Sequence, residues 1–403
     1  MIAKRFKFPK IDNITLLILV KFLTSLYFYI PYMTLYFLGL GFNYIQINSI
    51  WGIIVFTMFL AEVPTGILAD RWGRRRAIQA AIFLQFIGEL MFLFITDYWL
   101  LVLNAVIAGV GFAFSSGALE ALIYDHLEVI NREDQMSKVM GQVNSAGFVG
   151  FILSFGISSL LIQNINQNNI RSAILATVVS VGLGFITTQF LKTGKAANEE
   201  NQPERRIKEI FKDGWVVLRD NHKLQHLILL SILTIAFWDY LSSLYQPYFQ
   251  KIGVPDSLFG FTLALASLFA FLAARNVHII EKIIGPRMSL LIATLGPGLI
   301  YLILFLNRIP WLGILLVALF RGFNALKHPL FASYINHQIA SHSRATVLSM
   351  INMLAGLYTA LMGIVIGAVA ERSLLGSFFF TGLVVSVSAL FIALDKSSTF
   401  SKR

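Results

Sequence analysis

The stretch Glu62–Arg76 reads Glu-Val-Pro-Thr-Gly-Ile-Leu-Ala-Asp-Arg-Trp-Gly-Arg-Arg-Arg and separates two long apolar runs, near residues 47–69 and 77–96. At about 1.5 Å per residue, each run can cross the roughly 30 Å of hydrocarbon in a bilayer. Backbone groups cannot stay unpaired in lipid, and residues 78–95 lack the alternation of a barrel strand. We therefore predict a short charged connection between two membrane-spanning helices.

Similar apolar runs recur along the whole chain. Apolar residues make up 57% of the 403 positions and charged residues 13%, whereas a soluble domain has about 25% charged residues. The sequence thus predicts an all-α integral membrane protein with twelve transmembrane helices. The expected spans lie near residues 14–38, 47–69, 77–96, 98–126, 139–162, 170–191, 224–250, 257–280, 288–306, 311–336, 345–370 and 374–394.

The distribution of basic residues predicts the orientation in the membrane. A net charge of +11 would suggest nucleic acid as a partner of a soluble protein, but these residues gather in alternate connections. We count about 24 Lys and Arg on one side and about 4 on the other. The positive-inside rule then places both termini in the cytoplasm, and we expect a multi-pass protein of the plasma membrane that contacts lipid and no nucleic acid.

One long polar stretch divides the chain into two parts. We predict a first bundle of six helices over residues 1–191, a cytoplasmic loop over 192–223 and a second bundle over 224–403. The segment Val139–Gly147 (VMGQVNSAG) resembles Val347–Gly356 (VLSMINMLAG), about half the chain further on. This weak internal repeat agrees with two related halves.

The charged stretch after the second span resembles the GxLxDRxGRR signature of the major facilitator superfamily. The matching residues are Gly66, Asp70, Arg71, Gly73, Arg74 and Arg75. The resemblance implies a fold of two six-helix bundles and a cytoplasmic latch that stabilises the outward-facing state. Asp70 can accept hydrogen bonds from the start of the eleventh span near Arg344, and Arg74 or Arg75 can pair with Asp125. Alternatively, the arginines only fix the topology.

The resemblance also implies that the first, fourth, seventh and tenth helices line a central cavity. Charged side chains inside a membrane are costly and are functional candidates. Those four helices carry Lys21, Glu120, Asp239, Arg321 and Lys327. From their depths, we expect Asp239 and Arg321 to form an ion pair or share a substrate site, and Lys21 to pair with Glu120. Both pairs could instead be structural.

Other polar and aromatic residues give weaker signals. Tyr27, Trp238 and Tyr240 are candidates for the cavity lining and favour amphipathic, aromatic or cationic solutes. Tyr32 and Tyr245 better suit the interfacial aromatic belt. Glu89, near the middle of the third span, is a further cavity candidate.

The sequence favours no enzyme class. It contains no cysteine, Walker loop, dinucleotide fingerprint or zinc-ligand spacing, so we expect no metal and no cofactor. The predicted function is secondary transport of a small organic solute by a monomer, with proton antiport and export of an amphipathic compound as the leading subclass. Symport or facilitated uptake of a nutrient remains an alternative. A membrane sensor or a lipid-handling enzyme is a more remote one.

Overall fold

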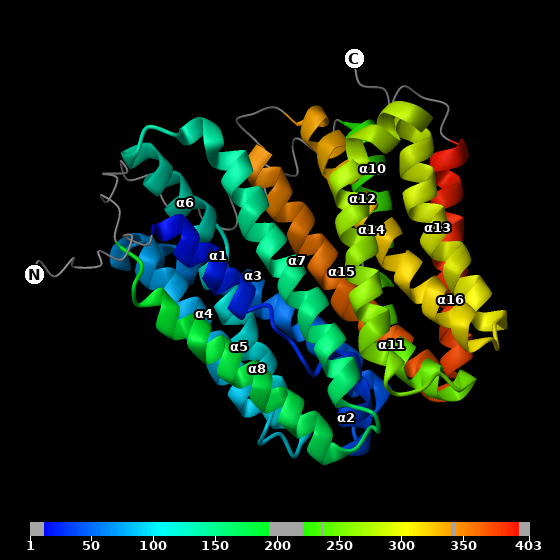
Figure 1. Cartoon of the computed structure of the whole chain (residues 1–403). Coiled ribbons are helices and arrows are strands. Elements are labelled where there is room, and N and C mark those ends of the chain that lie inside the picture. The colour runs from blue at the N-terminus through cyan, green and yellow to red at the C-terminus, as the bar shows by residue number, and fades with distance from the viewer. Residues whose placement is uncertain (1–11, 193–218, 220, 236, 340–343, 395–403) are drawn as a thin grey trace, which may run out of the picture.

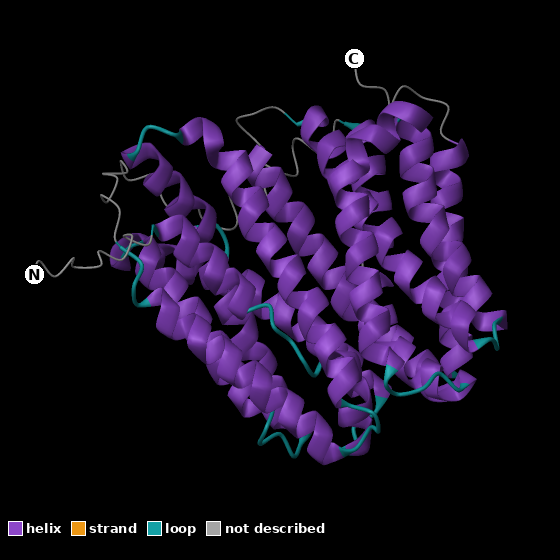
Figure 2. Ribbon diagram, in the orientation of Figure 1, coloured by secondary structure: helices purple, strands orange, loops and turns teal. Residues whose placement is uncertain are grey.

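The computed structural model describes residues 12–192, 219, 221–235, 237–339 and 344–394, and the described chain is helical with short connections (Figure 2). In chain order the helices are α1 (Asn13–Leu23), η1 (Ile30–Tyr32), α2 (Met33–Gly39), α3 (Tyr44–Trp72), α4 (Arg74–Met91), α5 (Tyr98–Ser115), α6 (Ala118–Val129), η2 (Glu133–Gln135), α7 (Met136–Leu161), α8 (Gln167–Thr188), α10 (His222–Ile235), α11 (Phe237–Ile252), α12 (Leu258–Ile284), α13 (Pro286–Leu306), α14 (Pro310–Gln338), α15 (Arg344–Arg372) and α16 (Leu374–Leu394), where η marks a 3₁₀ helix.

The prediction of an all-helical membrane protein is confirmed. By length and composition, eight helical segments of the described chain can cross a membrane. They are Tyr44–Trp72, Tyr98–Val129, Glu133–Leu161, Gln167–Thr188, Leu258–Ile284, Pro286–Leu306, Pro310–Asn336 and Met350–Arg372. The other four expected spans coincide with α1–α2, α4, α10–α11 and α16, which are not among these eight segments, so their full crossing stays a prediction.

The first expected span is interrupted, which hydropathy alone did not reveal. Regular helix stops after Leu23 and resumes at η1, where Pro31 lies in the first turn, a position at which its missing backbone N–H leaves no bond unmade. Helix α8 supplies partners for the interrupted backbone. The Thr177 hydroxyl accepts from the Phe28 N–H at 3.0 Å, and the Ser180 hydroxyl donates to the Leu23 carbonyl at 2.7 Å. The interruption is therefore a stabilised feature of the fold.

The fourth expected span also changes direction. Helix α5 ends at Ser115, and Gly117 adopts a φ of 75° before α6 begins. Only glycine takes this left-handed conformation at little cost. As a result, residues on α6 do not continue the face that they would share with α5 in one straight helix.

The helices form two groups that meet along a seam, α1–α8 on one side and α10–α16 on the other (Figure 1). The main helix pairs across the seam are α3 with α15 and α7 with α12. Small residues allow α3 and α15 to approach closely: a Cβ added at Gly363 would lie 2.8 Å from the Asn48 carbonyl oxygen, and one at Gly367 would lie 2.7 Å from the Ile45 Cα.

The two ends of the molecule differ, and we call them the closed end and the motif end. The closed end carries the turns at residues 40–43, 162–166, 253–257 and 372–373, and the motif end carries those at Gly73, 130–132 and Gly285. The two groups of helices meet near α2 and α11 and lean apart toward the motif end (Figure 1). Contact between the groups is therefore closer at the closed end.

Candidate functional site

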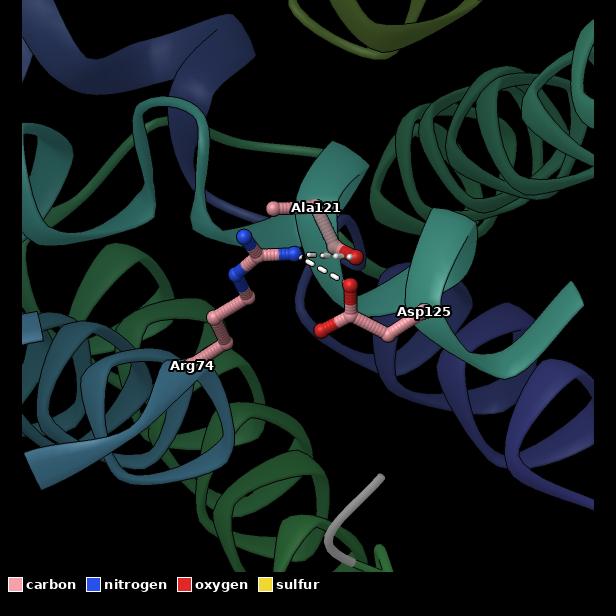
Figure 3. Close-up of polar contacts among 3 residues, drawn as sticks. All are labelled: Arg74, Ala121 and Asp125. Atoms are coloured by element: carbon pink, nitrogen blue, oxygen red, sulfur yellow. Dashed lines mark hydrogen bonds and ion pairs between the residues drawn. The ribbon is translucent and has the colours of Figure 1, made fainter. Parts of the chain in front are cut away.

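The charged loop after α3 is fixed by an ion pair inside the first group of helices. Gly73 has a φ of 87°, which lets the chain reverse from α3 into α4. Arg74, the first residue of α4, donates from Nη1 to the Ala121 carbonyl at 3.1 Å and also contacts the carboxylate of Asp125 (Figure 3). The predicted pair between Arg74 and Asp125 is thus present and joins α4 to α6.

The other signature residues lie in different surroundings. Arg75 donates from Nη2 to the Gln189 carbonyl at 2.8 Å, which ties the loop to the end of α8. Gly66, Asp70 and Arg71 are exposed, and space is open beside Gly66. Asp70 forms no hydrogen bond with any described residue, and the side chain of Arg344 lies outside the described part. The expected contact between Asp70 and the eleventh span therefore stays a prediction.

The closed end is held by contacts between α7 and α12. A Cβ added at Gly260 would lie 2.3 Å from the Phe155 carbonyl oxygen, so the two backbones touch here. The Ser159 hydroxyl accepts from the Phe261 N–H at 3.0 Å. Beside this contact, the Ile165 N–H donates to the Asp256 carboxylate at 2.9 Å. Backbone and polar contacts therefore close the seam at this end.

The second group of helices also caps the interrupted first span. The buried side chain of Gln246 on α11 accepts through Oε1 from the Thr34 N–H at 2.8 Å and the Leu35 N–H at 3.3 Å, and donates through Nε2 to the Ile30 carbonyl at 3.0 Å. The Tyr245 hydroxyl donates to the Pro31 carbonyl at 3.0 Å. No side chain of its own segment caps α2, so residues across the seam satisfy backbone groups that a helix end leaves free.

The charges expected in the first half do not meet in this conformation. Lys21 is half-buried, and its aliphatic chain packs against Gly147 of α7. Glu120 is exposed in the first turn of α6, and the two form no ion pair. The depth estimate assumed one straight helix over residues 98–126, whereas the turn at Gly117 reorients Glu120. The expected pair is therefore absent here.

The charges of the second half are partly described. Arg321 on α14 is half-buried. Lys327, six residues further along, is buried and donates to the Thr234 carbonyl near the end of α10. Asp239 and Trp238 lie in the first turn of α11, but their side chains are outside the described part. The pairing of Asp239 with Arg321 stays a prediction.

The aromatic residues lie in surroundings other than those that the sequence predicts. Tyr27 stacks on Phe151 with ring centroids 6.1 Å apart, and Tyr240 is buried with its hydroxyl donating to the Thr359 carbonyl. Tyr32 and Tyr245, expected in the interfacial belt, are 0% and 1% exposed. Both lie in the seam at the closed end, where Tyr32 stacks on Phe259 of α12. Their assignment to the belt was wrong because contact between the halves removes them from the lipid.

Glu89 is buried inside the first group of helices rather than open to a cavity. It is 6% exposed, and its Oε2 accepts from the Tyr29 hydroxyl at 2.8 Å. The sequence indicates its depth in the span. Its partner could not be found that way, because Tyr29 reaches it only through the interruption of the first span.

Residues 16–363 match the family described as Major Facilitator Superfamily. The uncharacterized MFS-type transporter YxaM of Bacillus subtilis is 22% identical over 364 residues, which cover 89% of this chain and 88% of that protein. Multidrug resistance protein 2 of the same organism is 26% identical over 222 residues, covering 53% of this chain and 52% of its own.

Solved structures agree in fold. The nucleoside transporter NupG superposes with a TM-score of 0.77 at 15% sequence identity, covering 98% of this chain and 100% of its own. The D-xylose-proton symporter gives a TM-score of 0.71 at 13% identity, with 96% and 98% covered. At these identities the likeness concerns the fold alone.

Proposed function

The chain belongs to the major facilitator superfamily of secondary transporters for small solutes, and from this premise we propose that it exports an amphipathic organic compound in exchange for protons. In this proposal, six-helix bundles over residues 1–191 and 224–403 are joined by the loop 192–223 and together make twelve spans. The positive-inside rule places the motif end and both termini in the cytoplasm, and we propose the plasma membrane as the location.

One observation carries the alternating-access mechanism. Contacts across the seam gather at the closed end, while Gly66 and Asp70 on α3 are exposed at the other end. Under the proposed orientation this is an inward-facing conformation, in which the latch of Asp70 on the eleventh span is released. Rocking of the bundles would separate the contacts at the closed end and bring α3 against α15 at the motif end. The central site would then be exposed to the outside.

The proposal of proton-coupled export rests on the charged residues of the second half and on one relative. The side chains of Arg321 and Lys327 offer positive charge in the second half, and Asp239 is the carboxylate proposed to exchange a proton for Arg321 or solute. The partial similarity to Multidrug resistance protein 2 supports export. Proton-coupled uptake is the second candidate, and the direction of solute counterflow in sealed vesicles separates the two.

Proton coupling can be tested in liposomes that contain an interior pH dye. A panel of tetraphenylphosphonium, benzoate and xylose is added to wild type, Asp239→Asn and the control Asp134→Asn, which changes an exposed carboxylate at the motif end. We expect solute-driven proton flux in wild type and control, and loss of most of that flux in Asp239→Asn, because asparagine cannot carry a proton. Solute movement without proton flux in wild type would contradict antiport, and normal coupling in Asp239→Asn would make Asp239 structural.

A further inference from the structure

The structure contains a buried carboxyl group whose role the proposed central site does not explain. Glu89 lies on the inner face of α4, and the titratable groups that face it among the described residues are the hydroxyls of Tyr27 and Tyr29, from the interrupted first span. Helices α5 and α8 offer only uncharged groups nearby, such as Asn104, which donates to the Gly88 carbonyl at 2.6 Å. No Lys, Arg or His of the described chain forms an ion pair with Glu89.

This environment suits a carboxyl group that gains and loses a proton. An isolated carboxylate is costly to bury in an apolar interior, and a bound proton removes that cost. The Tyr29 hydroxyl donates to Oε2 at 2.8 Å and can do so whether the group is charged or neutral. Both forms are therefore compatible with the observed contact, but the neutral form is favoured wherever the pocket stays sealed.

The pocket is sealed by the interruption of the first span. Gln85 lies one turn before Glu89 on the same face of α4, and its Nε2 donates to the Thr24 carbonyl at 3.0 Å and to the Tyr27 hydroxyl at 2.8 Å. The ring of Tyr29 packs on Phe92 with centroids 5.4 Å apart. The interrupted segment thus covers Glu89 and is held in place by α4.

The same segment continues directly into the closed end. Tyr29 immediately precedes η1, and within η1 the carbonyls of Ile30 and Pro31 accept from Gln246 and Tyr245 across the seam. The partner of Glu89 is therefore adjacent in the chain to backbone groups held by the other half. A movement that releases Gln246 from η1 also displaces Tyr29 and admits water to the carboxyl group.

We propose that Glu89 is a proton-binding site inside the first half, separate from the central site, and that the segment 24–32 links its proton to closure of the closed end. The inference rests on the proposed alternating-access function. A sealed Glu89 binds its proton more tightly than one open to water, so low pH stabilises the closed end. As the pH rises, loss of the proton favours opening.

The link can be tested by distance measurements that need no substrate. Because the chain has no native cysteine, spin labels can be placed at the closed end by Asn168→Cys and Arg372→Cys, both exposed and on opposite halves. The distance between the two labels is short when the closed end is shut and longer when it opens. In lipid nanodiscs, the longer distance is expected to become more populated in the otherwise wild-type protein as the pH rises. Glu89→Gln, which imitates the neutral acid, is expected to stay at the short distance and to lose this pH-dependent shift.

Three variants make the result decisive. Glu62→Gln, which changes an exposed carboxylate on α3, is expected to keep the full shift, and Glu89→Asp to restore it in part. Tyr29→Phe removes one hydroxyl donor, leaves the carboxylate less stabilised in the sealed pocket, and is expected to extend the pH-dependent shift to higher pH. A full shift in Glu89→Gln, or a shift in Tyr29→Phe that ends at the same pH as in wild type, would overturn the inference. Proton flux by wild type tests the proposed function separately, since it does not depend on Glu89 being the linked group.

Discussion

Replacing Gln246 by leucine is expected to open the closed end in most molecules. Leucine has a similar size but leaves the Thr34 and Leu35 N–H groups and the Ile30 carbonyl without the partners they have in the structure. A buried polar group without a partner costs about 1–3 kcal/mol. For two or three such groups, the balance between conformations shifts by about a hundredfold or more, since about 1.4 kcal/mol corresponds to a factor of ten.

The matched control lies one turn further along the same helix. Gln250 on α11 is exposed and its side chain forms no hydrogen bond with the described residues, so Gln250→Leu is expected to behave like wild type. The measurement is the spin-label distance between positions 168 and 372. A distance in Gln246→Leu that stays as short as in wild type would show that the cap contributes little to closure.

Replacing Gly260 by leucine is expected to slow transport strongly while leaving each half folded. A Cβ at this position would already lie 2.3 Å from the Phe155 carbonyl and 2.8 Å from the Ser158 Oγ, both on the opposite half. Overpacking a fitted site costs about 1–3 kcal/mol and occasionally more. Here the obstacle is backbone rather than a flexible side chain, so closure of the seam is disfavoured and about a tenfold to hundredfold loss of turnover is expected.

Gly156 provides the control on the opposing helix α7. A Cβ added there meets nothing within 4 Å, so Gly156→Leu tests the cost of losing a helical glycine without blocking the seam. The two variants are compared by exchange of the panel solute that wild type moves and by melting temperature in detergent. Equal exchange by both variants would contradict a mechanism that requires α7 and α12 to touch.

The positions of the helices and the motif ion pair could be predicted because each follows from local sequence. Apolar runs fix where a chain can cross hydrocarbon. Arg74 and Asp125 were expected together because each lies at the same end of neighbouring spans, where a partly buried charge needs a partner. In the first case the signal is the apolar run, and in the second it is the place of each charge at the end of its own span.

The breaks in the helices escaped prediction because hydropathy does not measure backbone geometry. The break after Leu23 and the turn at Gly117 both lie inside runs apolar enough to span, and neither changes the polarity of the sequence. The turn at Gly117 then explains the missing pair of Lys21 and Glu120. Equal depth in the membrane brings two charges together only if their helices present them to one another.

The seam could not be predicted from the sequence. Gln246 binds residues more than two hundred positions away, and a single glutamine in an apolar run carries no sign of its partner. Tyr245 and Tyr32 are of a residue type that is common in the interfacial belt, yet contact between the halves buries them. These residues depend on which conformation the halves adopt, and that information is tertiary.

The most direct test of alternating access compares both ends of the molecule in one experiment. A second label pair, Glu133→Cys and Lys282→Cys, joins exposed positions of the two halves at the motif end. Distances for both pairs are recorded in nanodiscs across pH and with tetraphenylphosphonium. If the halves rock as proposed, every condition that lengthens the 168–372 distance shortens the 133–282 distance. Distances that lengthen together, or that never change at either end, would contradict alternating access.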